Sequence, residues 1–214
     1  MSMKEYITDI KELNSKKVLI YINDAPSFAL YKNEPEKLGI HEGEVFDETK
    51  KNELYGDTLY KRALNRSLGL IKTRDHTINE IKTKLGKEYY PDEIIHKLIC
   101  FLKENNFLDD KRYAAGYISY YSATKSLMLI KQELIKKGVD KSVIEEEMTG
   151  YSEQNPDIEE ELIFKLLSSK YDPDITFDDE KDKYKFKSKV FAFLLRKGFS
   201  SGMAGEAIKA YFDI

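Results

Sequence analysis

Residues 103–114, which read KENNFLDDKRYA, decide how this chain is divided. One helical pattern closes here on an apolar pair, Phe107 and Leu108. The next pattern opens with Asp109 in a capping position and Asp110 in the first turn. Two carboxylates suit a helix start because the first N–H groups of a helix lack intrahelical partners and carry partial positive charge. The segment therefore predicts a joint between similar helical modules, and arrays of such modules usually present surfaces for binding.

The patterns on both sides of this joint follow one plan, in which two helices, a glycine or loop, a cap and a third helix recur three times. Positions 85 and 134 lie 49 residues apart and positions 134 and 194 lie 60 apart, so the last unit is longer. A repeating period indicates units that bury their apolar faces against one another. The apolar positions in register are Ile81, Leu85, Tyr90, Ile95 and Ile99 in the first unit, Ile130, Leu134, Val139, Ile144 and Met148 in the second, and Val190, Leu194, Phe199, Ala204 and Ile208 in the third.

This register assigns residues 56–108, 109–155 and 156–214 to three successive three-helix repeats, the last with an acidic loop insertion near residues 171–182. Residues 1–55 differ, because Lys17–Ile22 and Ser27–Tyr31 flank turn residues and predict a β-hairpin, followed by a short helix capped by Asp47. A lone hairpin is marginal in water, so it must pack on something. The predicted fold is mainly α, with three tandem three-helix repeats in an elongated array that can curve and a small N-terminal β-hairpin segment.

Several helix ends are marked by cap residues. Thr77 with Glu80 three residues later predicts a capping box at the start of a helix. Gly86, Gly138 and Gly198 are each placed to end a helix, since glycine adopts the left-handed conformation at low cost.

Composition limits the class of protein. Apolar residues make up 41% of the 214 residues and charged residues 34%, which is too apolar for a disordered chain and highly charged for a compact enzyme. The net charge of −3 argues against a generic nucleic-acid binder. Basic residues nevertheless gather at 61–74, 125–137 and 183–197, and acidic residues between 145 and 182.

The location expected from the sequence is cytoplasmic. No stretch approaches the roughly 18 apolar residues that span a bilayer, and the N-terminus lacks the order of a signal peptide. One cysteine, Cys100, excludes an internal disulfide framework, and its apolar neighbours predict a buried core thiol.

Candidate catalytic chemistry is sparse. His41, His76 and His96 lie in different segments, and His96 with Cys100 at i, i+4 would supply only two of the four ligands of a typical zinc site. We find no nucleophile elbow and no glycine-rich phosphate loop. The sequence therefore predicts no metal, no cofactor and no enzymatic activity.

Three segments together resemble a known family, the bacterial RecX regulatory proteins: Asn106–Ala114 (NFLDDKRYA), Ile130–Val139 (IKQELIKKGV) and Leu195–Ser200 (LRKGFS). The resemblance covers residues 57–214 well and the N-terminal segment more weakly. It implies three tandem three-helix repeats, a cytoplasmic location and a role in recombinational repair and the SOS response. Members of the family bind the RecA recombinase, free and as a filament on single-stranded DNA, and usually limit its strand exchange, ATPase and coprotease activities. Some members also bind DNA.

Four tyrosines next to Arg112 have the composition of an interface hot spot and could also stack on bases. Tyr113, Tyr117 and Tyr121 are spaced at i, i+4 and i+8, which favours a core stripe between repeats. Tyr120 is the better surface candidate.

Basic residues complete the set of residues predicted to bind a partner. They could line one concave face if the repeats curve, but the sequence does not show that they share a face. The full set is Lys61, Arg62, Arg66, Arg74, Arg112, Tyr120, Lys125, Lys131, Lys136, Lys137, Arg196 and Lys197.

The leading hypothesis is a monomeric, non-enzymatic regulator that docks along the RecA filament through several repeats and inhibits it. The main alternative is a DNA-binding protein that uses its three-helix units like helix-turn-helix readers, independently of RecA, on single- or double-stranded DNA. A helical-repeat scaffold for an unrelated protein is the third interpretation.

Overall fold

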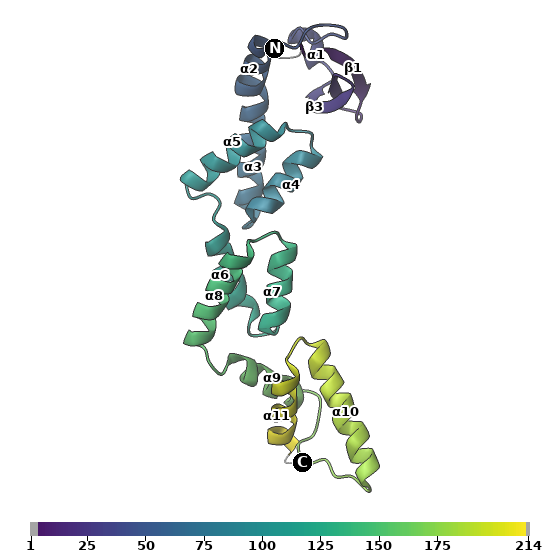
Figure 1. Ribbon diagram of the computed structural model, residues 1–214, viewed down its shortest axis with the longest axis vertical. Coiled ribbons are helices and arrows are strands. Elements are labelled where there is room, and N and C mark those ends of the chain that lie inside the picture. The colour runs from purple at the N-terminus through teal and green to yellow at the C-terminus, as the bar shows by residue number, and fades with distance from the viewer. Residues whose placement is uncertain (1–3, 213–214) are drawn as a thin grey trace. The chain divides into compact units, whose positions relative to one another are not determined.

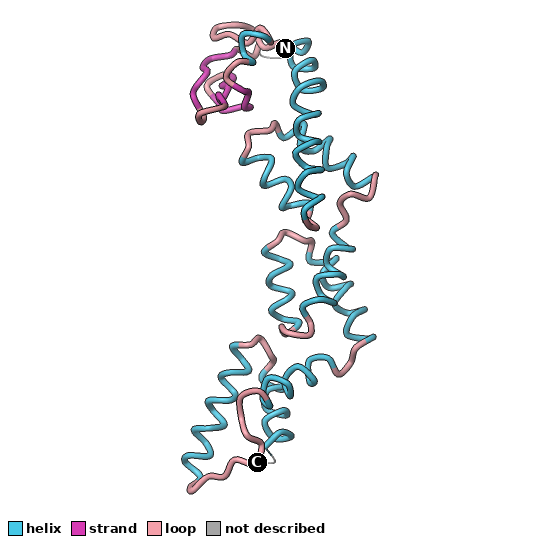
Figure 2. The backbone as a smooth tube through the Cα atoms, turned by 180° about the vertical axis from the view of Figure 1, so that it is seen from behind, coloured by secondary structure: helices cyan, strands magenta, loops and turns pink. Residues whose placement is uncertain are grey.

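The computed structural model describes residues 4–212, and the chain forms two compact units that meet in sequence between Asp109 and Asp110. Helices make up most of both units, and the strands are confined to the N-terminal part of the first (Figures 1 and 2). The predicted fold class, mainly α with three-helix units and a small N-terminal β segment, is confirmed. No helix within residues 4–212 is long and apolar enough to cross a membrane.

The N-terminal β segment is a three-stranded antiparallel sheet, formed by β1 (Ile7–Glu12), β2 (Lys17–Ile22) and β3 (Ala25–Tyr31) in sequential order. The predicted hairpin is β2 with β3, and the prediction missed β1. This edge strand has four polar residues among its six and buries only Ile7 fully, so its apolar signal is weak. The β2–β3 turn places Asn23 and Asp24 at positive φ, the conformation that two-residue hairpin turns require.

The sheet packs on the first helices and shares their core. Phe28 lies against Phe46 and Tyr55, with ring centroids 5.6 Å and 6.1 Å away respectively. Buried residues from the sheet and from the helices belong to one hydrophobic cluster, which includes Leu59 and Leu98. The requirement that the β segment pack on something is therefore met within the first unit.

The first unit continues through α1 (Glu34–Lys37), α2 (Glu48–Glu53), the π-helical η1 (Leu54–Tyr60), α3 (Lys61–Thr73), α4 (Ile78–Lys87) and α5 (Asp92–Glu104). We expected a short helix after Asp47 that is separate from the first three-helix repeat, which begins at residue 56. The backbone instead stays helical from α2 through η1 into α3, since Leu54 and Tyr60 both keep right-handed helical dihedral angles. The Asp47 side chain accepts a hydrogen bond from the Lys50 N–H, as its predicted capping role requires.

The second unit comprises α6 (Asp110–Tyr121), α7 (Leu127–Lys136), α8 (Lys141–Gln154), α9 (Ile158–Ser168), α10 (Glu180–Arg196) and α11 (Ser201–Phe212). The segment expected to be an acidic loop is divided: it is non-helical through Asp179, and α10 begins at Glu180. Asp179 caps this start by accepting a hydrogen bond from the Asp182 N–H at 2.7 Å. Part of the extra length of the last repeat therefore extends a helix, since α10 has 17 residues and α7 has 10.

Equivalent positions of the three repeats play the same structural role. Ile81, Ile130 and Val190 are all fully buried. At the end of each middle helix a backbone N–H donates a hydrogen bond to the carbonyl five residues earlier. The donors and acceptors are Tyr90 and Leu85, Val139 and Leu134, and Phe199 and Leu194. This is the Schellman type of helix end, which needs a residue at positive φ.

The residue at positive φ differs between repeats. Gly138 and Gly198 take this position as predicted, but in the first repeat it is Tyr89, at φ 59°. The prediction that Gly86 ends the helix was wrong, because α4 continues to Lys87. The capping box of Thr77 and Glu80 is confirmed.

Candidate partner-binding surface

Within the second unit, the start of α7 is held by the third repeat. The Ser126 side chain is 1% exposed, caps α7 and donates a hydrogen bond to the Lys197 carbonyl at 2.8 Å. The next N–H, of Leu127, donates to a Glu159 carboxylate oxygen at 3.0 Å. Gly198 completes the contact, because a Cβ added there would lie 2.4 Å from the Ser126 Oγ and 2.8 Å from the Leu129 Cγ. We call this contact the inter-repeat joint.

A groove of about 550 Å³ opens beside the joint. Residues from α7 and from the α10–α11 turn form most of its walls, with one residue each from α8 and α9. Met128 on α7 and Leu195 on α10 are 54% and 42% exposed, which is high for large apolar side chains. Two of the predicted partner-binding residues, Lys131 and Arg196, line this same groove. We call it the inter-repeat groove.

The tyrosines of α6 form a ladder with two basic residues, Lys125 and Lys137, that flank α7 on either side. Tyr117 lies between Tyr113 and Tyr121, with ring centroids 5.9 Å and 4.4 Å away respectively. The Lys125 ammonium lies 4.2 Å from the Tyr121 ring centroid, and the Lys137 ammonium lies 5.5 Å from that of Tyr117. These distances permit cation–π attraction.

Glu133 on α7 joins the ladder to its basic residues. Its carboxylate accepts hydrogen bonds from the Tyr117 hydroxyl at 2.7 Å and from the Lys125 ammonium at 2.8 Å. The Lys125 bond holds the pKa of the Glu133 carboxyl below its usual range, while burial and then the Glu133 bond raise the pKa of the Tyr117 hydroxyl. Lys125 is therefore engaged within its own repeat.

The interpretation of the tyrosines as a stripe between repeats was wrong. Tyr113, Tyr117 and Tyr121 are partly buried against the core of their own repeat, formed by α6, α7 and α8. Helical spacing reveals that such residues share a face but does not reveal which element covers it. Tyr120 lies on the surface with 76% exposure.

Arg62 stabilises the first unit internally. Its guanidinium donates to a Glu34 carboxylate oxygen at 2.5 Å and lies 4.7 Å from the Tyr31 ring centroid. Both charged side chains are about four-fifths covered. Arg62 thus fastens β3 and α1 to α3, and this position leaves little of it for a partner.

The other predicted basic residues of the first unit also have acidic neighbours. The pairs are Lys61 with Asp57 at 3.0 Å, Arg66 with Glu88 at 2.7 Å, and Arg74 with Glu80 at 3.1 Å. Exposed pairs of this kind contribute little to stability, and a stronger external partner can exchange them.

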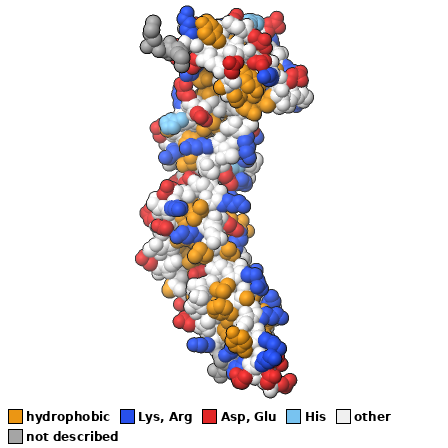
Figure 3. Space-filling model, turned by 45° about the vertical axis from the view of Figure 1, so that its right-hand side comes forward, with side chains coloured by type: hydrophobic (Ala, Val, Ile, Leu, Met, Phe, Trp, Pro, Cys, Tyr) orange, Lys and Arg blue, Asp and Glu red, His pale blue; other side chains and the backbone are white. Residues whose placement is uncertain are grey.

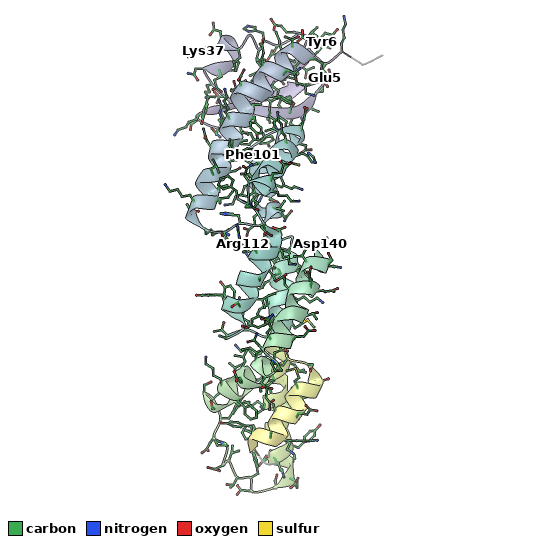
Figure 4. All side chains as sticks on the ribbon, turned by 90° about the vertical axis from the view of Figure 1, so that its left-hand side faces the viewer. Glu5, Tyr6, Lys37, Phe101, Arg112 and Asp140 are labelled. Carbon is green, nitrogen blue, oxygen red and sulfur yellow. The ribbon has the colours of Figure 1, made fainter. Side chains whose placement is uncertain are left out.

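The remaining candidates lie in the second unit. Arg112 is exposed in the first turn of α6 (Figure 4), and Lys136 and Lys197 are exposed at the ends of α7 and α10. Lys131 pairs with Glu145 at 3.3 Å. The structure thus distributes the predicted set over both units and brings together two small groups, Lys125 with Lys137 beside the ladder and Lys131 with Arg196 at the groove. The functional role of every member stays a prediction.

The exposed face of α10 was missed as a candidate surface. Lys181, Tyr184, Lys185 and Lys189 are exposed and recur every three to four residues, and Tyr184 is 72% exposed. Figure 3 shows Lys and Arg side chains gathered along α10, with hydrophobic side chains beside them. The basic cluster at 183–197 was visible in the sequence, and its helical spacing was the signal that could have placed it on one face.

Cys100 is exposed, so the prediction of a buried core thiol was wrong. Its apolar run belongs to α5, where Leu98, Ile99 and Leu102 are buried. Position 100 falls on the opposite side of the helix. Within residues 4–212 no group of His, Cys, Asp and Glu side chains is arranged to hold a metal ion.

His76 is buried at 4% exposure and has partners on both ring nitrogens. Nδ1 lies 2.9 Å from the Arg74 carbonyl oxygen, and Nε2 lies 3.3 Å from the Lys84 ammonium. Because a carbonyl can only accept, Nδ1 carries the proton and the Nε2 lone pair accepts from Lys84. This arrangement requires a neutral imidazole, and burial accordingly lowers the pKa of His76.

The neutral His76 makes the first unit sensitive to acid. Its pKa is lower in the folded than in the unfolded chain, so the unfolded chain takes up the proton first as pH falls. The stability is present above the unfolded pKa of about 6.5 and declines below it. We expect His76→Gln to flatten the dependence of the urea midpoint on pH between about 7.5 and 5, with His41→Gln, at an exposed histidine, as the control. Equal slopes for all three proteins would contradict this assignment.

The repeated three-helix units, the open apolar groove and the exposed basic helix define a helical-repeat protein with apolar and basic surface outside its cores. Comparison with known proteins agrees with this class and identifies a family within it. A family model described as "RecX, second three-helix domain" matches residues 109–148. Regulatory protein RecX of Clostridium acetobutylicum is 32% identical to this chain and the match covers 97% of this chain and 96% of that protein. This chain belongs to the RecX family.

Solved structures of the family have the same fold. The crystal structure of RecX from Lactobacillus salivarius superimposes with a TM-score of 0.61 and 25% identity, covering 73% of this chain and 98% of that one. A further crystal structure of regulatory protein RecX gives a TM-score of 0.60 and 24% identity, covering 96% and 99% of the two chains. The known relatives are named as regulatory proteins, which agrees with a regulatory role for this one.

Proposed function

We propose that this protein binds the RecA recombinase, free or as its filament on single-stranded DNA, and limits its strand exchange, ATPase and coprotease activities. It acts in the cytoplasm as a non-enzymatic monomer during DNA repair and the SOS response. The observation that carries this proposal is membership of the RecX family over nearly the whole chain. A regulator of a filament needs contacts that repeat along a lattice, and a protein built of similar repeats can supply them.

The surfaces described above support binding at several points. The inter-repeat groove offers apolar contact area, and the exposed face of α10 offers positive charge. Several weak contacts on one chain produce strong overall binding when a lattice lets them form together. Such binding slows filament growth or holds the filament in a less active state.

The DNA-dependent ATPase of RecA tests this proposal. We expect the addition of the protein to lower the ATPase rate at substoichiometric ratios, because one bound molecule affects a stretch of filament. Filament length by electron microscopy is the second measurement. An unchanged ATPase rate together with an unchanged length distribution would contradict the proposal.

The second candidate function is direct DNA binding without RecA, and the exposed basic face of α10 is the observation that favours it. Lysines that contact phosphates release counterions, so such binding weakens steeply as salt rises. A mobility shift without RecA, at about 50 and about 200 mM salt, separates the two functions. Tight, salt-sensitive binding that Lys185→Glu and Lys189→Glu abolish, with no effect on RecA, would favour the alternative.

A further inference from the structure

The methionines of the second unit all meet at the inter-repeat groove. Met128, Met148 and Met203 come from α7, α8 and α11, and all three line the groove. They are all the methionines within residues 4–212. Methionine has a flexible, polarisable side chain that adapts to different apolar surfaces, and it is over-used where proteins receive partner helices. The buried residues of the core clusters are all aliphatic or aromatic, and Met148 and Met203 are only partly buried against them.

The groove has an apolar interior with basic residues at its edge. Phe199 is buried at 4% exposure, while Met128 and Leu195 are substantially exposed. Arg196 forms no ion pair with any of residues 4–212, and the only other basic lining residue is Lys131. The acidic lining residue, Glu159, already accepts a hydrogen bond from the Leu127 N–H. The charge available to a partner is therefore positive.

We propose that the inter-repeat groove receives an amphipathic helix of a protein partner, with bulky apolar side chains in the groove and a carboxylate facing Arg196. Apolar anchors fit the methionine-lined walls, and helix-in-groove recognition buries the apolar face of the partner helix. A nucleic acid fits poorly, because its phosphates gain nothing from methionine and leucine. The inference rests on the proposed function, in which that partner is RecA.

The test places the same charged residue inside and outside the groove. Met128→Asp and Leu195→Asp put a carboxylate on the apolar walls. Ile135→Asp is the matched control, because Ile135 is 40% exposed on α7 and is not among the groove residues. We expect each groove variant to weaken binding to RecA filaments by about 30-fold or more, the effect of losing an interface hot spot. The control should stay within about threefold.

A charge reversal tests the proposed carboxylate. Arg196→Glu should weaken binding by about tenfold, whereas Lys209→Glu on α11 should have little effect. Circular dichroism and thermal unfolding of each variant identify any that fail to fold, and a photocrosslinking residue at position 195 gives a second measurement in otherwise wild-type protein. The expected crosslink is to a helical RecA peptide containing Asp or Glu. A crosslink to the DNA strand, or to a RecA segment without that character, would overturn the inference.

The outcomes separate this inference from the proposed function. If the wild-type protein binds and inhibits RecA and the groove variants do so equally well, the groove inference fails and the proposed function stands. If the wild-type protein neither binds RecA nor alters its ATPase, both fail.

Discussion

Gly198→Ala is expected to lower the free energy of unfolding of the second unit by about 3 kcal/mol. Two costs add up to this loss: alanine in a left-handed backbone conformation, and the overpacking caused by its Cβ. Gly198 has φ +87°, which a residue with a Cβ adopts at a cost. The new Cβ would also approach within 2.4 Å of the Ser126 Oγ. Ser126 cannot easily move aside, because it caps α7 and donates to the Lys197 carbonyl. The substitution therefore strains the inter-repeat joint as well as the end of α10.

Urea unfolding with hydrogen exchange measures this effect and locates it. Faster exchange should concentrate in α7, α10 and the start of α11. The matched control is Gly205→Ala in α11, where a Cβ meets no atom within 4 Å and φ is not positive. Since alanine favours helix over glycine, this control should be neutral or stabilise by up to about 1 kcal/mol. A Gly198→Ala protein as stable as the wild type would show that the joint does not constrain position 198.

Leu194→Ala is expected to cost about 3 kcal/mol, while the neighbouring Leu195→Ala costs less than about 1 kcal/mol. Leu194 is fully buried in the core of the last repeat, and Leu195 is 42% exposed in the inter-repeat groove. Both substitutions remove the same atoms from the same helix. Only the first leaves a cavity among packed side chains, and a cavity adds to the lost transfer free energy.

Chemical denaturation of the two variants side by side gives the comparison. The chain has no tryptophan, so far-ultraviolet circular dichroism is the suitable probe of its helices. Similar losses of stability would mean that Leu195 packs as tightly as Leu194 and that the groove is not open. A folded Leu195→Ala protein with weaker RecA binding would agree with the proposed role of the groove.

The repeat register was predictable because helix packing imposes a period on the sequence. Leu85, Leu134 and Leu194 could be matched without coordinates, and each is fully buried. The π-helical link between α2 and α3 could not be predicted, since its residues are compatible with an ordinary helix or a loop. Strand β1 was missed because a polar edge strand owes its conformation to its neighbour β2.

Candidate sites were less predictable than the fold. Arg62 and Arg66 were identified as surface charges, yet their partners Glu34 and Glu88 are 28 and 22 residues away in sequence. Spacing on one helix says nothing about such distant partners. The groove was not predicted either, because its walls come from helices of two repeats whose contact depends on Ser126 and Gly198.

The sequence by itself determined the helical-repeat class, the register of the three units and the family, because apolar periodicity and cap residues act locally along the chain. Tertiary structure alone decided which element covers each buried face, which charges are paired internally and where an apolar groove remains open. These features depend on side chains that are distant in sequence and meet only when the repeats pack. The boundary between helical units at residues 103–114 was visible in the sequence. The inter-repeat groove was visible only in the tertiary structure.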